Sequence, residues 1–267
     1  MTGILVSAHV YPVKSCAGAS VPAAEVTLRG LRHDRSFGLA DPDGKIRTQR
    51  EARRLALARP DLSALDRGIL TVTAPDRPDL REQIVYDGVR HLVRIWGDTV
   101  PVVDQGDEAA DWFTTLTGSP CRLVRLPDDH VRAVDERFGA GEVSLADGFP
   151  LLLTSTASLA DLQARIGRAL PMDRFRPNLV IDGWDEPFVE DTVTRLAVGE
   201  MTFELVKPCG RCVITTTDQA TAERGHEPLA TLATYRRGEF GLHFGQNAVP
   251  VGTGTVRVGD PVRIIGV

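Results

Sequence analysis

Cysteine is scarce in this sequence. The chain of 267 residues has four, Cys16, Cys121, Cys209 and Cys212. The disulfide frameworks that stabilise small secreted domains need more cysteines at closer spacings. A chain of this length can also bury a core large enough to fold without crosslinks or a structural metal. We therefore expect a protein of a reducing compartment and predict a cytoplasmic location.

Long apolar runs are also missing. The first residues, MTGILVSAHVYPVKS, contain no basic leader followed by a sustained apolar segment. No later stretch approaches the roughly 20 apolar residues that cross a bilayer. We expect neither export nor membrane insertion.

The sequence has no excess of positive charge. It contains 31 Lys plus Arg against 36 Asp plus Glu, which gives a formal net charge of -5. Such a balance does not favour binding to a polyanionic backbone, so nucleic acid is not an expected partner. Arginine greatly outnumbers lysine, and a guanidinium group suits bidentate recognition of phosphate or carboxylate. The composition is therefore compatible with a small anionic ligand.

Short runs with strand character dominate the first half of the sequence. Turn signals recur between them at a spacing that is typical of β-rich domains. Strands are predicted in residues 4–13, 23–31, 36–48, 68–76, 91–104 and 121–126. Apolar residues at helical intervals predict helices in residues 50–62 and 107–118.

The second half also has mainly strand character, which makes the predicted fold class α+β and β-rich. Residues 127–150 carry charges, glycines and prolines without a clear period, as an ordered loop or interdomain connection does. A helix is expected to begin near Ser158, with that serine as its cap and Leu162 on its apolar face. Strands separated by glycine-rich loops are predicted in residues 150–154, 178–183, 195–208, 212–217 and 254–267.

Cys209 and Cys212 form a C-x-x-C pair, for which the residues alone leave several interpretations open. A structural zinc site usually takes four ligands from two such motifs, and the sequence has no second one. A thioredoxin-like pair opens a helix, whereas residues 213–217 have strand character. Two buried thiols can also act as small apolar residues. Finally, Lys207 and Arg211 are close enough in sequence to stabilise one reactive thiolate.

Several motifs, in order along the chain, resemble one family. They are YPVKSCAG (11–18), GLRHDRSFGL (30–39), RTQRE (47–51), FRPNLVIDG (175–183), PCGRCVITTTDQATAERGHEPLATLATYR (208–236), FGQN (244–247) and GTVRVGDPV (254–262). With these motifs the sequence resembles, nearly end to end, the MOSC family of molybdenum-cofactor proteins. The similarity is to the branch that contains the mitochondrial amidoxime reducing component and its bacterial relatives. It implies an N-terminal β-barrel-like domain in residues 1–122, followed by a MOSC β-barrel domain with a few helices in residues 123–267.

The resemblance also implies which residues bind the cofactor. Cys212 stands at the second cysteine of the family motif, which implies that it is the protein ligand to molybdenum. A soft thiolate suits a metal that cycles between high oxidation states. Cys209 is not an expected ligand and is given a packing or supporting role. The positions implied to bind the cofactor are Lys14, Ser15, Arg35, Ser155, Ser158, Arg176, Asn178, Gly210, Arg211 and Asn247.

Some of these residues also have simpler explanations. Lys14 and Arg35 suit a cofactor phosphate, but outside these motifs they would be ordinary surface charges. Ser158 also serves as a helix cap. Asp218 is a candidate catalytic residue for proton handling, and the alternative is a solvated aspartate in a turn.

The implied activity is that of a molybdenum-cofactor-dependent oxidoreductase. It would reduce small N-oxygenated or N-hydroxylated compounds by removing oxygen at molybdenum, independently of pyridoxal phosphate. The sequence has neither a G-x-G-x-x-G fingerprint nor an iron–sulfur cysteine set. We therefore expect an external electron donor protein of the ferredoxin, flavoprotein or cytochrome type. The alternative function is a molybdenum-cofactor or sulfur carrier or transfer protein of the same family.

Overall fold

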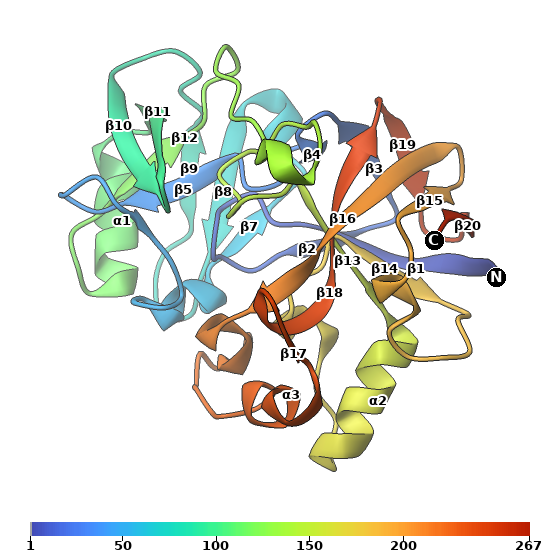
Figure 1. The fold of residues 1–267 in the computed structure, drawn as a ribbon. Helices are drawn as coiled ribbons and strands as arrows, with labels where there is room; N and C mark the ends of the chain where they lie inside the picture. The colour runs from blue at the N-terminus through green and yellow to red at the C-terminus, as the bar shows by residue number, and fades with distance from the viewer. Residues whose placement is uncertain (1) are drawn as a thin grey trace.

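A closed barrel of seven strands forms one side of the fold, to the right in Figure 1, in a computed structural model that describes residues 2–267. In order around the barrel, the strands are β13 (Leu151–Ser155), β14 (Leu179–Asp182), β1 (Thr2–Val10), β20 (Pro261–Gly266), β15 (Arg195–Val198), β16 (Met201–Arg211) and β18 (Gly241–Val251). Pairing between β13 and β18 closes the ring. The pairing of β13 with β14 is parallel, and the other pairings in the ring are antiparallel.

The first strand of the chain belongs to this barrel, together with strands from the C-terminal half. A bulge between Leu5 and Ser7 interrupts the alternation of side chains in β1, so that Leu5, Ala8 and Val10 are all buried. Through β1 the N-terminus lies between β14 and β20. The two halves of the chain therefore share one barrel. The predicted boundary between residues 122 and 123 stays a prediction.

The rest of the N-terminal half forms three smaller sheets and one helix. One sheet has the order β10-β11-β12-β5-β6, another β7-β8-β9, and the third joins β3 and β4 to β19 near the C-terminus. The elements are β3 (Ala23–Thr27), β4 (Gly30–Leu31), β5 (Phe37–Ala40), β6 (Ile46–Arg47), β7 (Arg59–Asp61), β8 (Ile69–Thr73), β9 (Leu80–Gln83), β10 (Arg90–Ile95), β11 (Asp98–Asp104), α1 (Asp107–Thr117), β12 (Arg122–Arg125) and β19 (Gly254–Arg257). Short strands β2 (Ala19–Val21) and β17 (Arg237–Gly238) extend the barrel sheet beside β1 and β18.

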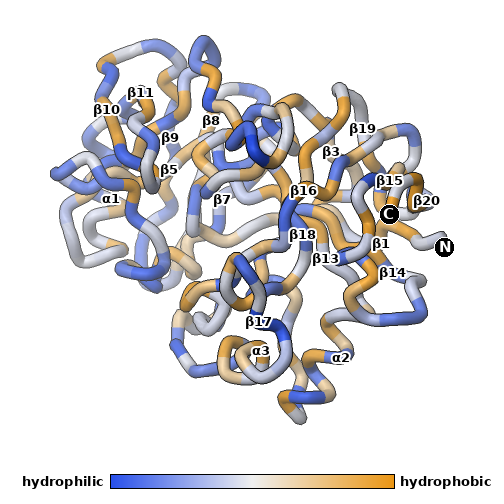
Figure 2. The backbone as a smooth tube through the Cα atoms, in the orientation of Figure 1, coloured by the Kyte–Doolittle hydropathy of each residue, from blue (hydrophilic) through white to orange (hydrophobic). Residues whose placement is uncertain are grey.

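Separate apolar cores fill the barrel and the region beneath α1. The barrel core includes Leu5, Leu153 and Phe203, while Phe37 and Phe113 belong to the core beneath α1. In Figure 2 the barrel strands are largely hydrophobic, and hydrophilic residues gather in the connecting loops. None of the helices in residues 2–267 is both long and apolar enough to cross a membrane.

The helix predictions are partly confirmed. Helix α1 forms as predicted. Helix α2 (Thr156–Ile166) begins earlier than predicted, because its cap is Ser155, whose Oγ accepts a hydrogen bond from the Ser158 N–H at 3.1 Å. The helix predicted in residues 50–62 is wrong, since only a short 3-10 turn at Arg53–Leu57 forms before β7. Pro60 explains the early end, because a proline disfavours helical geometry in the residue before it.

The strand predicted at residues 212–217 is also wrong. Val213–Thr216 form a 3-10 turn, in which the hydroxyls of Thr215 and Thr216 donate to the carbonyls of Cys212 and Val213 at 2.9 and 2.8 Å. Such local bonds compete with a strand ladder. Cys212 therefore lies where β16 ends and the chain turns.

Two elements lie where glycine-rich loops were predicted. They are α3 (Leu229–Tyr235) and the long strand β18. Side chains on both faces of β18 are buried, so its sequence GLHFGQNAVPV lacks the alternation that identifies a half-exposed strand.

We predict that Gly245→Ala weakens closure of the barrel. Gly245 has φ 76°, and an added Cβ would lie 2.6 Å from the carbonyl oxygen of Leu153 on β13. The strained backbone and the clash should lower the free energy of unfolding by about 2 kcal/mol or more. Gly225→Ala is the control, since nothing lies within 4 Å of its added Cβ. Equal urea midpoints for the two variants would contradict the prediction.

Candidate functional site

An open cleft lies where the two halves of the chain meet, with about 830 Å³ of empty space including the part open to solvent. Its walls come from the segment after β1, from the segments before β5, β7, β13 and β14, from the end of β16 with the turn after it, and from β18. The predicted site residues that line it are Lys14, Ser15, Arg35, Arg176, Asn178, Gly210, Arg211, Cys212 and Asn247. The structure thus brings together residues from five separate motifs.

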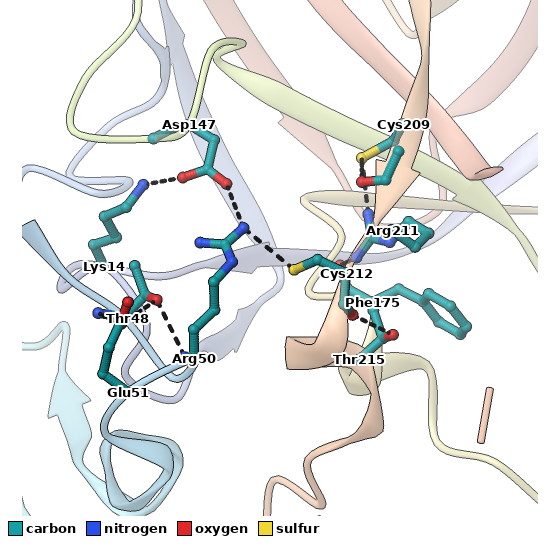
Figure 3. A network of polar contacts seen from close by, with 12 residues as sticks. Lys14, Thr48, Arg50, Glu51, Asp147, Phe175, Cys209, Arg211, Cys212 and Thr215 are labelled. Carbon is teal, nitrogen blue, oxygen red and sulfur yellow. Dashed lines mark hydrogen bonds and ion pairs between the residues drawn. The ribbon is translucent and has the colours of Figure 1, made fainter. Parts of the chain in front are cut away.

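The two cysteines at the cleft have different partners (Figure 3). Both are free thiols of intermediate exposure. A guanidinium N–H of Arg50 donates to Cys212 Sγ at 3.3 Å. Arg211 instead donates to Cys209 Sγ at 2.8 Å and to the carbonyl of Phe175 at 2.6 Å. The two thiols of the C-x-x-C pair therefore accept hydrogen bonds from two different arginines.

Gly210, between the two cysteines, is required by a close approach of backbones. An added Cβ would lie 2.5 Å from the carbonyl oxygen of Phe240 in the turn before β18. Any larger residue would push this turn away from the end of β16.

Arg50 and Asp147 are site residues that the sequence analysis did not identify. Lys14 is only 6% exposed and forms an ion pair with Asp147, whose other oxygen lies 3.8 Å from Arg50 Nη2. Burial lowers the pKa of Lys14, an effect that the charge of Asp147 opposes. Burial would raise the pKa of Asp147, but the charges of Lys14 and Arg50 outweigh it and hold that pKa well below its usual range. The carboxylate therefore stays ionised and links two cations at the rim.

A buried arginine orders the loop that carries Asp147. Arg132 is 6% exposed and donates to the carbonyls of Ser144, Ala146 and Asp147 at 3.0, 2.6 and 2.9 Å. Residues 127–150 thus form an ordered loop as predicted, apart from a short 3-10 turn. The sequence signal for Asp147 was weak because a single aspartate in a charged loop resembles a solvated residue.

Three residues other than glycine at the cleft have left-handed backbone conformations. Ser15, Arg35 and Arg176 have φ values of 69°, 47° and 56°. Each such conformation costs of order 1–3 kcal/mol, and such strain clusters at functional sites. Their gathering in one cleft is an observation independent of the motifs.

Arg35 and Arg176 are held in place by buried neighbours. Arg35 donates to Asn178 Oδ1 at 3.0 Å and to the carbonyl of Arg176 at 3.1 Å. The guanidinium carbons of Arg35 and Arg176 lie 4.2 and 4.4 Å from the centre of the buried Tyr11 ring. Burial of Asp34, which pairs with Arg35, raises the pKa of that carboxyl. The ring and the Asn178 amide therefore fix two cations against the cleft.

Two buried guanidinium atoms at the cleft, Arg176 Nη2 and Arg211 Nε, have no hydrogen-bond partner among residues 2–267. A buried donor without a partner costs roughly 1–3 kcal/mol, and more when it is charged. Burial, reinforced by Arg35, lowers the pKa of Arg176 to about 10, so it remains protonated at neutral pH. The donor set therefore fits a ligand with anionic or strongly polar oxygen atoms beside the Cys212 thiol.

A second layer of contacts fixes Arg50 relative to Cys212. The amides of Gln49 and Gln219 exchange hydrogen bonds at 3.0 and 3.1 Å, and Gln49 also donates to the Ser15 carbonyl at 2.7 Å. Arg224 bonds to Thr217 Oγ1 at 3.3 Å and to the carbonyls of Gln49 and Arg50. These contacts join the turn before β7 to the segment after Cys212, and no local sequence pattern indicates them.

Ser155 and Ser158 do not line the cleft. Their hydroxyls donate to the two oxygens of the buried Glu190 at 3.0 and 2.7 Å, and Ser155 caps α2. Burial raises the pKa of Glu190. In this structure both serines support the start of α2, and their role in cofactor binding stays a prediction.

Asp218 also lies outside the cleft lining. It accepts hydrogen bonds from the backbone N–H groups of Ala220 and Thr221 at 2.9 and 3.1 Å, and Arg174 lies 3.8 Å away. Burial opposes these bonds, but together with the arginine they lower the pKa of Asp218. The geometry is that of a turn aspartate, and its catalytic role stays a prediction.

Comparison with known proteins defines the class of this chain. Residues 2–120 match the MOSC N-terminal beta barrel domain, and residues 140–263 match the MOSC domain. The chain belongs to the MOSC family, as the motifs predicted.

Individual proteins of known name are also similar to this chain. The chain is 34% identical to human "Mitochondrial amidoxime-reducing component 1" over 286 residues, which cover 99% of this chain and 83% of that protein. It is 33% identical to human "Mitochondrial amidoxime reducing component 2", with 97% and 83% covered. A rice "Molybdenum cofactor sulfurase" is 34% identical over 263 residues, with 90% of this chain but 32% of that protein covered.

We predict that Asp147→Asn lowers the free energy of unfolding at neutral pH by about 1–3 kcal/mol, because it leaves the buried Lys14 ammonium without its carboxylate. The pKa of Asp147 is lower in the folded than in the unfolded protein. The pair therefore stabilises the fold above the unfolded-state pKa of about 4, and this stabilisation is lost as pH falls. The difference between wild type and variant in urea unfolding should shrink from neutral pH towards acid.

Asp129→Asn is the control for this prediction. Asp129 forms an exposed ion pair with Arg90 at 2.8 Å, and such pairs contribute little. A destabilisation by Asp147→Asn that is independent of pH, or no larger than that of the control, would show that the Lys14 pair is unimportant.

Proposed function

We propose that this protein is a molybdenum-cofactor-dependent reductase of N-hydroxylated compounds. The observation that carries the proposal is the position of Cys212. Its thiol borders a cleft whose other walls present cations, two of which have a buried donor without a hydrogen-bond partner among residues 2–267. The similarity to two amidoxime reducing components supports the same activity.

The residues of the cleft fit the proposed cofactor. Lys14, Arg35 and Arg176 would hold its phosphate and the polar edge of its pterin, since charge-assisted bonds to phosphate are the strong ones. Arg211 and Asn247 border the same space. Cys212 would supply the thiolate ligand to molybdenum, a soft donor suited to that metal.

The cofactor, when bound, supplies the two-electron chemistry that cleaves the N–O bond. Overall, an amidoxime, two electrons and two protons give an amidine and water. Arg50 places a guanidinium N–H donor next to Cys212 Sγ. The open cleft admits a small substrate and solvent protons. The electrons come from an external donor protein of the ferredoxin, flavoprotein or cytochrome type.

A second candidate function is a molybdenum-cofactor or sulfur carrier or transfer protein. The similarity to molybdenum cofactor sulfurase over 90% of this chain favours it. A carrier releases its cofactor or sulfur to an acceptor protein, whereas a reductase keeps the cofactor through many turnovers.

The test of the proposed function is a measurement of metal content followed by an activity assay. Protein made in a host competent for molybdenum-cofactor synthesis should contain stoichiometric molybdenum and pterin. It should reduce benzamidoxime to benzamidine over many turnovers with an artificial reductant. Bound cofactor without turnover would support the carrier, and zinc without pterin would refute both functions.

We predict that the two cysteines differ in their effect on activity. Cys212→Ser should lower benzamidoxime turnover per bound molybdenum by more than about 100-fold, because serine oxygen is a harder and poorer electron donor. Cys209→Ser should keep most of the activity, since the serine oxygen still accepts the bond from Arg211.

X-ray absorption provides the second measurement on these variants. It should count one sulfur ligand fewer in Cys212→Ser and an unchanged number in Cys209→Ser. Equal inactivation of both variants, with a disulfide on oxidation, would favour a redox pair instead.

A further inference from the structure

A second groove opens from the rim of the cleft, which we call the outer groove. It is formed by β6, the end of β10 and the turn that carries Arg50. The outer groove and the cleft share Lys14, Thr48, Arg50 and Asp147 in their walls. A molecule lying in the outer groove is therefore next to the site of the proposed chemistry.

Trp96 forms one wall of the outer groove in an unusual conformation. It is 69% exposed and is the first residue of the two-residue turn between the paired residues Ile95 and Asp98. Its φ is 56°, a region that such turns usually reserve for glycine or asparagine. The protein therefore keeps a large aromatic ring in a strained and solvent-exposed position, where folding alone favours a small residue.

Trp96 is joined to Cys212 through a single side chain. The guanidinium carbon of Arg50 lies 4.9 Å from the centre of the Trp96 ring, and another atom of the same group bonds Cys212 Sγ at 3.3 Å. The guanidinium of Arg50 lies over one face of the indole, and the high exposure of Trp96 leaves the rest of the ring open. The open surface can stack with a planar group that reaches from the outer groove towards Cys212.

The charges of the outer groove favour a neutral ligand over a cation. Ile46 and Ile95 also belong to the walls but are buried in the core, so Trp96 supplies the exposed apolar surface of the groove. The charged residues of its walls are the cations Lys14, Lys45, Arg50 and Arg94 and the carboxylates Glu51 and Asp147. This excess of positive charge opposes cationic molecules. An amidoxime is neutral at neutral pH, whereas the amidine formed from it is a strong base and carries a positive charge.

We propose that Trp96 is a specificity-determining residue on which the ring of a neutral, planar aromatic N-hydroxylated substrate stacks. The N-hydroxyl group of that substrate points towards Cys212. This inference rests on the proposed function and adds to it the preferred substrate class. Aliphatic substrates enter the same cleft but gain nothing from the indole.

The test compares an aromatic with an aliphatic substrate in the cofactor-loaded protein. In Trp96→Ala, the ratio of kcat/KM for benzamidoxime to that for acetamidoxime should fall about threefold to tenfold, the range expected from losing one aromatic stacking contact. The loss should arise mainly in KM for benzamidoxime. Trp96→Phe, which keeps a ring, should recover most of the ratio.

Leu92→Ala is the matched control. Leu92 lies on the same hairpin, is 68% exposed, and is outside the outer groove. Its substitution should leave the ratio unchanged. An unchanged ratio in Trp96→Ala would overturn the proposal. An equal fall in kcat for both substrates would also overturn it, because Trp96 would then act by positioning Arg50.

A binding measurement separates this inference from the proposed function. Calorimetric titration of benzamidoxime into the oxidised protein, without reductant, should show Kd raised by the same factor in Trp96→Ala. If the wild type binds benzamidoxime more tightly than Trp96→Ala but does not reduce it, the reductase proposal fails and the stacking role of Trp96 stands. If the wild type reduces both substrates but Trp96→Ala binds benzamidoxime as tightly as the wild type, the stacking role of Trp96 is wrong and the reductase proposal stands.

Discussion

The contact between Arg50 and Cys212 is the interaction on which the arrangement of the site depends. The two residues are 162 positions apart, yet their side chains meet at 3.3 Å. Further hydrogen bonds hold the turn that carries Arg50 against the segment after Cys212. They join the amides of Gln49 and Gln219, and Arg224 to the carbonyl of Gln49. Strand β1, from the N-terminal end of the chain, also pairs with β14 and β20 of the C-terminal half, so the two halves are joined at the barrel as well as at this contact.

Concentrating cations in one cleft has an energetic cost that the fold meets with many local bonds. Asn178, the Tyr11 ring and Asp34 restrain Arg35, and Asp147 neutralises the buried Lys14. The remaining cost appears as left-handed backbone and as guanidinium donors that find no partner in the described part of the chain. A site that keeps such strain is preorganised for a ligand with anionic or strongly polar oxygen atoms, since less rearrangement is needed when the ligand binds. Both proposed functions, reductase and carrier, need a preorganised site, so repeated catalytic turnover is the property that distinguishes them.

Parts of the fold were predictable because their signals are local. Helix α1 and the alternating strands of the first half follow from periodicity in short windows. Strand β18 was missed because burial on both faces removes alternation, and the 3-10 turn after Cys212 was missed because threonine hydroxyls overrode a β-branched run. In β18 tertiary burial removed the expected alternation, and in the turn after Cys212 side-chain hydrogen bonds prevailed over β-propensity.

The sequence by itself determined the family, the β-rich class and nine of the residues that line the cleft, because ordered motifs carry that information whatever their positions in space. Only the tertiary structure decided which groups act on one another. It placed Arg50 on Cys212 rather than on Cys209, paired Lys14 with Asp147, and turned Ser155 and Ser158 towards Glu190. It also placed Trp96 at the rim. These pairings join residues separated by tens to more than a hundred positions. They arise from the packing of whole segments, which no window of neighbouring residues encodes.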